Sequence, residues 1–209
     1  MTSGPLPAAT HWDDTYLTKG EAGVSWHQDR PTPSLEALDQ LGVSAGDSVI
    51  DVGGGASTLV DELLTRGHRH VTVLDVSAQA LSLSEARLGT QAALVTWLYA
   101  DLLRWDPDRT FDVWHDRAVF HFLTTATERD QYRSVLDRAT HEESVLVIGT
   151  FAEDGPQHCS GLPVCRYSND ELVEQLPPTF APIASWRQVH DTPWRATQPF
   201  TWLVARRGR

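Results

Sequence analysis

The chain has 209 residues, a formal net charge of −11 at neutral pH and a composition that is 41% hydrophobic. This acidic balance argues against nucleic acid as a partner, and no apolar run reaches the roughly 18 residues that a membrane-spanning helix needs. The N-terminus has neither the basic start nor the apolar stretch of a signal peptide, so we expect a cytoplasmic protein that binds no membrane.

The N-terminal part of the chain differs from the rest. Residues 1–10 are rich in proline and alanine, and we expect them to be disordered. Residues 11–44 are predicted to form helices that cap the main domain. Three aromatic residues in this part, Trp12, Tyr16 and Trp26, are too costly to leave in water, so they should cover the sheet or a ligand.

From residue 45 to residue 209, apolar strand-like runs alternate with helix-like segments, and we assign this region to the main domain. Strands are predicted at 48–52, 71–75, 94–100, 111–114, 144–148, 184–189 and 200–206. Helices are predicted at 31–41, 58–65, 77–88, 127–141 and 169–176. This order predicts an α/β, Rossmann-like fold with a seven-stranded, mostly parallel sheet and helices on both faces. About ten residues join the last two strands, too few for a crossover helix, so the last strand should be antiparallel.

A glycine-rich turn follows the first predicted strand. Residues 49–58 read VIDVGGGAST, an apolar run that ends in Asp51 and continues into Gly53, Gly54 and Gly55. Glycines in such a turn let the backbone come close to a ligand. Ligands of open α/β sheets bind beyond the carboxyl ends of the strands, so we expect the cofactor to bind here.

Four successive predicted strands end at or next to a carboxylate: Asp51, Asp75, Asp101 and Asp116. We expect these side chains to form an acidic rim for a ligand with hydroxyl, NH or cationic groups. Asp75 follows Gly55 by 20 positions, a spacing typical of an acid that binds the ribose of an adenosine cofactor. A nicotinamide dinucleotide is disfavoured because Thr58 replaces the third glycine of its fingerprint and Asp51 would repel a pyrophosphate. S-adenosylmethionine, which carries positive charge and no phosphate, fits better.

The segment Asp51–Ser57 resembles the glycine-rich first motif of class I S-adenosylmethionine-dependent methyltransferases, D/E-x-G-x-G-x-G, with Ser57 in place of the last glycine. Asp75 is similar to that family's ribose-binding acid, and Asp101 with Leu102 to its adenine-binding motif. The resemblance covers roughly residues 45–205 and implies S-adenosylmethionine as cofactor. It implies cofactor contacts at Asp51, Gly53, Gly54, Gly55, Ser57, Asp75, Val76, Asp101, Leu102 and Trp26.

A finer resemblance concerns the aromatic residues near the N-terminus together with Asp116 and Arg117. These look like the group that includes lysine methyltransferases of elongation factor and related small bacterial enzymes. This resemblance does not fix the methyl acceptor.

The segment after the fourth predicted strand, His115–Leu123, reads HDRAVFHFL. Acceptors meet the methyl group at this position in the family that the chain resembles, so His121, Asp116 and His115 are candidate catalytic residues, with His121 and Asp116 as candidate bases. A structural interpretation stands beside this one. Asp116 and Arg117 would form an ion pair that fixes the loop, and His121 would be a core histidine between two phenylalanines.

Candidate contacts to the acceptor are Trp12, Tyr16, Arg117, Phe151, Cys159 and Arg166. Cys159 and Arg166 belong to a segment, residues 150–167, that is too long to be a simple connection. We expect it to lie over the substrate cavity, as a lid or as part of the binding surface. His158 next to Cys159 is weak evidence for a nucleophile or a metal site, and we expect no bound metal.

The aromatic residues around the expected site indicate a closed pocket. We therefore expect methyl transfer to a small-molecule thiol, amine or carboxylate. The main alternative is a protein lysine methyltransferase, whose protein substrate would be attracted by the acidic charge. An NAD-binding oxidoreductase and a cofactor-binding module without activity are less favoured.

Overall fold

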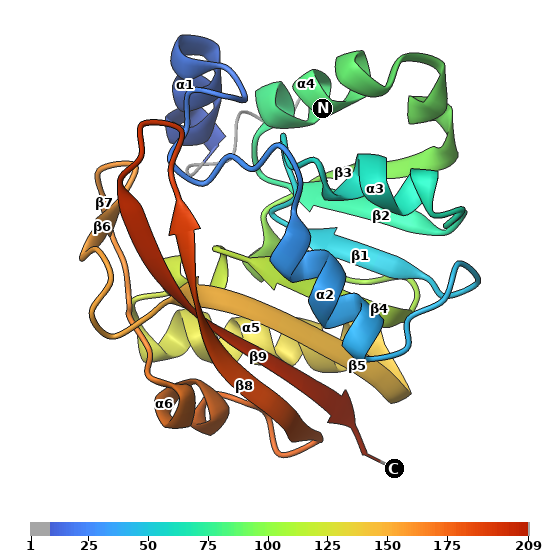
Figure 1. The fold of residues 1–209 in the computed structure, drawn as a ribbon. Helices are drawn as coiled ribbons and strands as arrows, with labels where there is room; N and C mark the ends of the chain where they lie inside the picture. The colour runs from blue at the N-terminus through green and yellow to red at the C-terminus, as the bar shows by residue number, and fades with distance from the viewer. Residues whose placement is uncertain (1–8, 209) are drawn as a thin grey trace.

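The computed structural model describes residues 9–208, and its centre is a seven-stranded sheet with helices on both faces (Figure 1). The strands lie in the order β3-β2-β1-β4-β5-β9-β8. The first five are parallel to their neighbours, whereas β9 is antiparallel to both β5 and β8. The predicted fold, with its antiparallel last strand, is confirmed.

The strands of the main sheet are β1 (Val49–Val52), β2 (Val71–Asp75), β3 (Val95–Tyr99), β4 (Phe111–Arg117), β5 (Thr140–Phe151), β8 (Phe180–Asp191) and β9 (Thr197–Arg207). A separate short hairpin comprises β6 (His158–Cys159) and β7 (Leu162–Pro163). The helices are α1 (Ala9–Lys19), α2 (Thr32–Gln40), α3 (Leu59–Thr65), α4 (Ala78–Leu88), α5 (Ala126–Ala139) and α6 (Asn169–Glu174). Within residues 9–208, no helix has the length and apolar character needed to cross a membrane.

Several predicted boundaries need correction: β5 and β8 are longer at both ends than predicted, and the start of α1 and the end of β4 also differ. Residues 9 and 10, expected to be disordered, belong to the first turn of α1, while residues 1–8 lie outside the described part. Strand β4 continues to Arg117, although its predicted end was residue 114. The reason is pairing on both sides, because His115 lies opposite Asp51 of β1 and opposite Val147 of β5. Backbone hydrogen bonds from two neighbours keep this charged segment extended.

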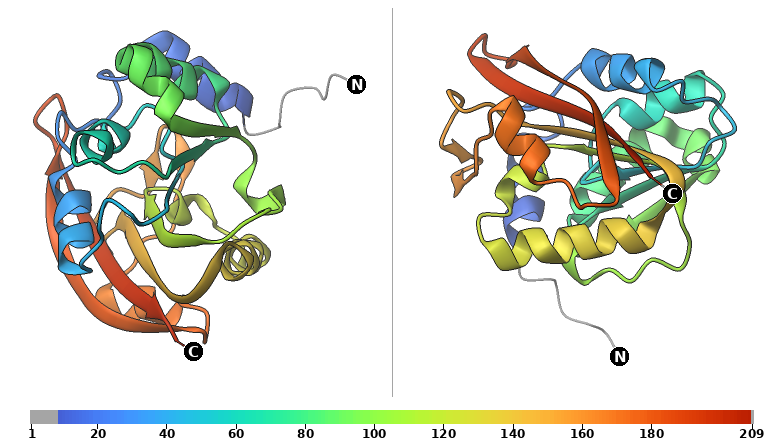
Figure 2. Two further views of the ribbon diagram at one scale, coloured as in Figure 1. Left: turned by 90° about the vertical axis from the view of Figure 1, so that its right-hand side faces the viewer. Right: turned by 90° about the horizontal axis from the view of Figure 1, so that it is seen from below.

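The core has two layers, one on each face of the sheet (Figure 2). Val49 of β1 packs with residues of α2, α3 and α4, whereas the adjacent Ile50 packs with residues of α5 and α6. Because successive side chains along a strand point to opposite faces of the sheet, one strand contributes side chains to both core layers. This alternation also decides where the polar side chains at the strand ends point.

The N-terminal segment packs against the start of α4. The Asp13 carboxylate accepts hydrogen bonds from Ser77 Oγ at 2.7 Å and from the Gln79 N–H at 3.1 Å. Tyr16 packs in a small buried cluster with Ala56 of the glycine-rich turn. Helix α1 therefore lies close to the turn that follows β1.

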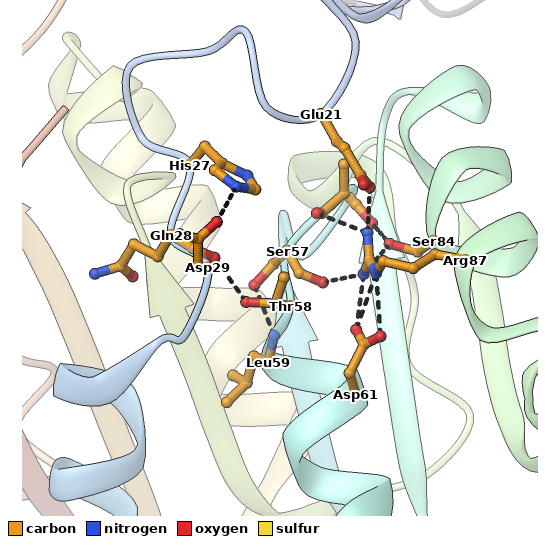
Figure 3. A network of polar contacts seen from close by, with 12 residues as sticks. Glu21, His27, Gln28, Asp29, Ser57, Thr58, Leu59, Asp61, Ser84 and Arg87 are labelled. Carbon is orange, nitrogen blue, oxygen red and sulfur yellow. Dashed lines mark hydrogen bonds and ion pairs between the residues drawn. The ribbon is translucent and has the colours of Figure 1, made fainter. Parts of the chain in front are cut away.

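Arg87 of α4 joins this segment to the glycine-rich turn (Figure 3). Its guanidinium donates to Asp61 at 2.8 Å, to the carbonyl oxygens of Ser57 at 2.7 Å and Ala56 at 3.3 Å, and to Glu21. One cation thus fixes the end of the turn, the first helix after it and the chain that precedes α2. Hydrogen bonds to a charged group contribute about 1.5–3 kcal/mol each in favourable settings.

We predict that Arg87→Met lowers the free energy of unfolding by about 2–3 kcal/mol, because two carboxylates and two carbonyls lose a shared donor. Urea denaturation measures the change. Arg66→Met is a suitable control, because Arg66 pairs with Asp39, whose side chain is 60% exposed, and surface pairs contribute about 0–1 kcal/mol. Equal losses in the two variants would contradict the role given to Arg87.

Candidate functional site

A cavity of about 580 Å³ lies at the carboxyl ends of the parallel strands. Its lining includes residues that follow both β1 and β4, the two strands between which the order of the sheet reverses. Open α/β sheets bind ligands at this point, and small-molecule sites have volumes of about 300–1,000 Å³. The cavity is therefore the candidate active site.

One end of the cavity is lined by five of the predicted cofactor contacts, Gly53, Asp75, Val76, Asp101 and Leu102. The Asp75 side chain is 8% exposed, and its Oδ1 accepts the Ser77 N–H at 2.8 Å. Burial raises the pKa of Asp75 to about 7. Asp101 Oδ1 accepts the Leu103 N–H at 3.1 Å. Two carboxylates, each held by a backbone N–H donor, thus face the cavity from the ends of the neighbouring strands β2 and β3.

The glycines of the turn make room for carboxylates. A Cβ atom at Gly54 would lie 2.5 Å from Asp51 Oδ2, and one at Gly55 would lie 2.6 Å from Asp75 Oδ2. Gly55 also has φ of +36° and Gly53 has φ of +65°, backbone conformations that residues other than glycine rarely adopt. A larger residue here would displace the acids that the turn surrounds.

Asp51 is not among the cavity-lining residues, and one of its carboxylate oxygens lies on the α2 side of the sheet. Its Oδ1 lies 2.7 Å from His115 Nδ1, and His115 Nε2 lies 2.9 Å from Ser34 Oγ. The three side chains are buried. Asp51 Oδ2 has no hydrogen-bond partner among the described residues, and a buried carboxylate oxygen requires a donor. A ligand ammonium group supplies such a donor, so the site fits the amino-acid end of S-adenosylmethionine as well as its ribose.

The structure places the candidate bases inside the protein. Asp116 is 0% exposed and accepts hydrogen bonds from the Val119 N–H and from Tyr132 Oη, both at 2.9 Å. Burial raises its pKa to about 6. His121 is also 0% exposed, and its Nδ1 accepts the Phe151 N–H at 3.3 Å. Burial lowers the pKa of His121 to about 3.

Neither these two side chains nor His115 lies on the cavity lining. The predicted ion pair between Asp116 and Arg117 does not form within the described residues. Successive residues of a strand point to opposite faces, so Asp116 turns toward α5 while Arg117 faces the cavity.

The remaining lining of the cavity includes Trp12, Tyr16, Arg117 and Cys159, together with Trp26, which was predicted as a cofactor contact and packs with Tyr16 beside Ala56 of the glycine-rich turn. We call this part the acceptor end. Trp26 Nε1 donates to Tyr16 Oη at 3.2 Å, and the Trp12 ring meets the Trp26 ring edge-on at 5.7 Å between centroids. Segments far apart in the sequence thus build one aromatic wall.

Three further predicted contacts lie elsewhere. Phe151 is 1% exposed and packs on Phe200 in the core. Arg166 donates to the Gly155 carbonyl at 3.2 Å and is not part of the lining. Ser57 Oγ accepts the Leu59 N–H at 3.1 Å at the start of α3. Within residues 9–208, no group of three or more His, Cys, Asp and Glu side chains could hold a metal ion.

Sequence reasoning pointed to the segment that follows Arg117 but missed which of its residues line the cavity. Ala118 and Val119 line the cavity, and a side chain at Gly53 would clash with Val119. Ala118 has φ of +72°, so the chain turns sharply here and presents residues that a continuous strand would direct elsewhere. Phe122, Leu123, Leu162 and Pro163 add apolar surface. The apolar run after Arg117 was visible in the sequence, but its contact with the glycine-rich turn was not.

Comparison with known protein families agrees with this geometry. Residues 49–140 match a family described as methyltransferase domain. The matched segment is therefore similar to a methyltransferase domain. The match spans β1 to the start of β5 and therefore includes the glycine-rich turn, Asp75 and Asp101. No curated protein sequence matches the chain.

Solved structures with the same fold include methyltransferases. The 1,6-didemethyltoxoflavin-N1-methyltransferase of Burkholderia thailandensis, crystallised with 1,6-didemethyltoxoflavin and S-adenosylhomocysteine, matches with a TM-score of 0.74 and 20% identity over 100% of this chain and 92% of its own. The N-methyltransferase NodS of Bradyrhizobium japonicum, with S-adenosylhomocysteine, has a TM-score of 0.69 and 14% identity over 94% of this chain and 98% of its own.

The fold also occurs in a protein described by another reaction. The [4+2]-cyclase SpnF matches with a TM-score of 0.71 and 14% identity over 96% of this chain and 95% of its own. The fold alone therefore does not define the chemistry. Together with the family match and the site geometry, it supports an S-adenosylmethionine-dependent methyltransferase.

We predict that Asp75→Asn weakens the binding of S-adenosylhomocysteine by more than about tenfold, because the ribose hydroxyls lose a charged acceptor. Isothermal titration calorimetry measures the affinity. Asp106→Asn, in a side chain that is 91% exposed, is the control. Unchanged affinity in Asp75→Asn would show that Asp75 is not the ribose contact.

The raised pKa of Asp75 also predicts a pH effect on the cofactor-free protein. The folded state keeps this proton up to a pKa of about 7, above the ordinary value of 3.8. Its stabilising contribution is therefore complete below the ordinary pKa and is lost as the pH rises through the folded-state value. Compared with the unmodified protein, Asp75→Asn should gain stability as the pH rises across this window, measured by thermal unfolding. A constant difference would contradict the shift.

Proposed function

We propose that the protein transfers the methyl group of S-adenosylmethionine to a small-molecule nucleophile. The observation that carries the proposal is the composition of the acceptor end. Trp12, Trp26 and Phe122 line it from one side, and Cys159, Leu162 and Pro163 from the hairpin of β6 and β7. Large apolar side chains around a cavity of about 580 Å³ suit a compact ligand that is largely removed from water.

Each end of the cavity has its own task in this proposal. Asp75 accepts hydrogen bonds from the ribose hydroxyls, Asp101 and the adjacent backbone contact the adenine, and Asp51 Oδ2 accepts a hydrogen bond from the ammonium group. The bound cofactor supplies a methyl group activated by its positive sulfur. The chain contributes the orientation of the acceptor and the exclusion of water.

The pKa values of the ionisable side chains at the acceptor end support a reaction without a general base. Burial raises the pKa of Cys159 to about 12 and raises the pKa of Tyr16 above its ordinary value, so both groups stay protonated at neutral pH. The predicted catalytic residues His115, Asp116 and His121 lie in the core. We therefore propose that the acceptor presents a free lone pair at the working pH, as a carboxylate, a thiolate, a ring nitrogen or an uncharged amine.

A protein lysine acceptor is a weaker proposal. The net charge of −11 suits a basic protein partner, and the resemblance to the elongation-factor group first suggested it. However, a lysine on a protein surface needs an open channel, whereas the bulky Trp12 and the β6–β7 hairpin line the acceptor end. A cytoplasmic location remains a prediction from the sequence.

The cofactor class provides the direct test. S-adenosylhomocysteine should bind with a dissociation constant of about 1–100 μM, corresponding to about −8 to −5 kcal/mol. NAD at the same concentrations should give no binding heat, because Asp51 repels its pyrophosphate. Calorimetry compares the two ligands directly. Binding of NAD without binding of S-adenosylhomocysteine would overturn the proposed function.

A further inference from the structure

Arg117 lies in the wall of the acceptor end and has no counter-ion among residues 9–208. Its Nη1 donates to the Trp26 carbonyl at 2.9 Å, and its guanidinium lies 5.1 Å from the centroid of the Phe200 ring. The Nε and Nη2 atoms are buried and have no hydrogen-bond partner among the described residues. Arg87, by contrast, is paired with Asp61 and Glu21.

This arrangement is costly in the free protein. Removing a cation from water costs several kcal/mol unless an anion and hydrogen bonds replace the solvent. Burial lowers the pKa of Arg117 to about 10, although nearby Cys159, Asp51 and Tyr16 oppose this effect. The side chain is still cationic at neutral pH. Its two unpartnered donors, Nε and Nη2, lie on one edge of the guanidinium and can bind a planar anion such as a carboxylate.

The charged side chains that line the cavity also indicate that Arg117 is available to bind an anion. Among the described lining residues, the cationic side chains are Arg104 and Arg117. Arg104 lies 3.5 Å from Asp101 at the cofactor end, so its charge is already compensated. Arg117 is the cation left for a ligand at the acceptor end.

We propose that Arg117 binds an anionic group of the methyl acceptor, so that the acceptor is a small anion with an apolar body. This inference rests on the proposed function. Trp12, Phe122 and Leu162 offer apolar surface for the body, and the unpartnered donors of Arg117 offer the site for a carboxylate-like group.

The carboxylate of the cofactor's amino-acid end has the same chemistry and is the competing source. The contacts of Arg117 favour the acceptor. Its guanidinium packs on Phe200 of β9 and donates to the Trp26 carbonyl, and Arg117 shares the cavity lining with Cys159 of the β6–β7 hairpin. Cys159 belongs to the acceptor end, whereas Trp26 lies between this end and Ala56 of the glycine-rich turn.

The test uses the full chain saturated with S-adenosylhomocysteine. Calorimetry compares benzoate with its uncharged and cationic counterparts, benzamide and benzylamine. We expect benzoate to bind at least about tenfold more tightly than either, as a charge-assisted contact implies. Arg117→Gln should abolish this preference while affinity for S-adenosylhomocysteine stays within about twofold. Arg117→Lys should keep part of the preference. Arg166→Gln, outside the lining, should leave it intact.

Several results would overturn the proposal. One is equal binding of the three probes, or no binding of any, by the unmodified protein that binds S-adenosylhomocysteine. A second is a preference for benzoate that persists in Arg117→Gln. A third is a loss of more than about tenfold in S-adenosylhomocysteine affinity in that variant, which would assign Arg117 to the cofactor carboxylate. Failure of the unmodified chain to bind S-adenosylhomocysteine would instead count against the proposed function.

Thermal unfolding separates a ligand-binding role from a structural one. Arg117→Met keeps an apolar side chain against Phe200 and removes the uncompensated charge. Its unfolding temperature without ligand should equal or exceed that of the unmodified protein, because exchange of a buried charge for an apolar group is often neutral or stabilising. A clear decrease would show that the guanidinium stabilises the fold and would overturn the proposal.

Discussion

The register between β1 and β4 is the constraint on which the site depends. It places Asp51 opposite His115 and Val52 opposite Asp116. Because side chains alternate along each strand, Asp51 and His115 meet on the α2 side, where Ser34 completes the buried network, while Asp116 turns to Tyr132 on the α5 side. A slip of one residue would exchange these faces and bury each acid against the wrong partners.

The buried polar side chains near the cavity are of two kinds. Some have all their hydrogen bonds to the chain itself, and others keep atoms that a ligand could pair with. Arg87 and Asp116 have their hydrogen-bonding capacity used by the chain itself, and both fix turns next to the cavity. Asp51 and Arg117 each keep a buried polar atom without a partner in the described chain. A ligand with an ammonium group near the first and an anionic group near the second would satisfy both. At these two positions the unpartnered polar atoms that would bind a ligand lower the stability of the ligand-free fold.

The nature of the acceptor end also explains why the fold cannot name the reaction. The same architecture occurs in N-methyltransferases and in a [4+2]-cyclase. The reaction depends on the side chains that a fold presents to its ligand. In this protein the wall of the acceptor end combines aromatic residues of the N-terminal segment, a cation at the end of β4 and the β6–β7 hairpin. We propose that the aromatic rings limit the size of an acceptor and that Arg117 selects its charge.

The sequence by itself determined the sheet, the glycine-rich turn and the places of Asp75 and Asp101 at the strand ends, because strand alternation, turn glycines and strand-end carboxylates are local patterns. The directions of Asp116 and His121, the path of the chain at Ala118 and the unpaired state of Arg117 came from tertiary structure alone. They depend on the register between strands distant in sequence and on burial, which a local pattern does not encode. For this reason the cofactor end was largely predicted from the sequence, whereas the acceptor end required the folded chain.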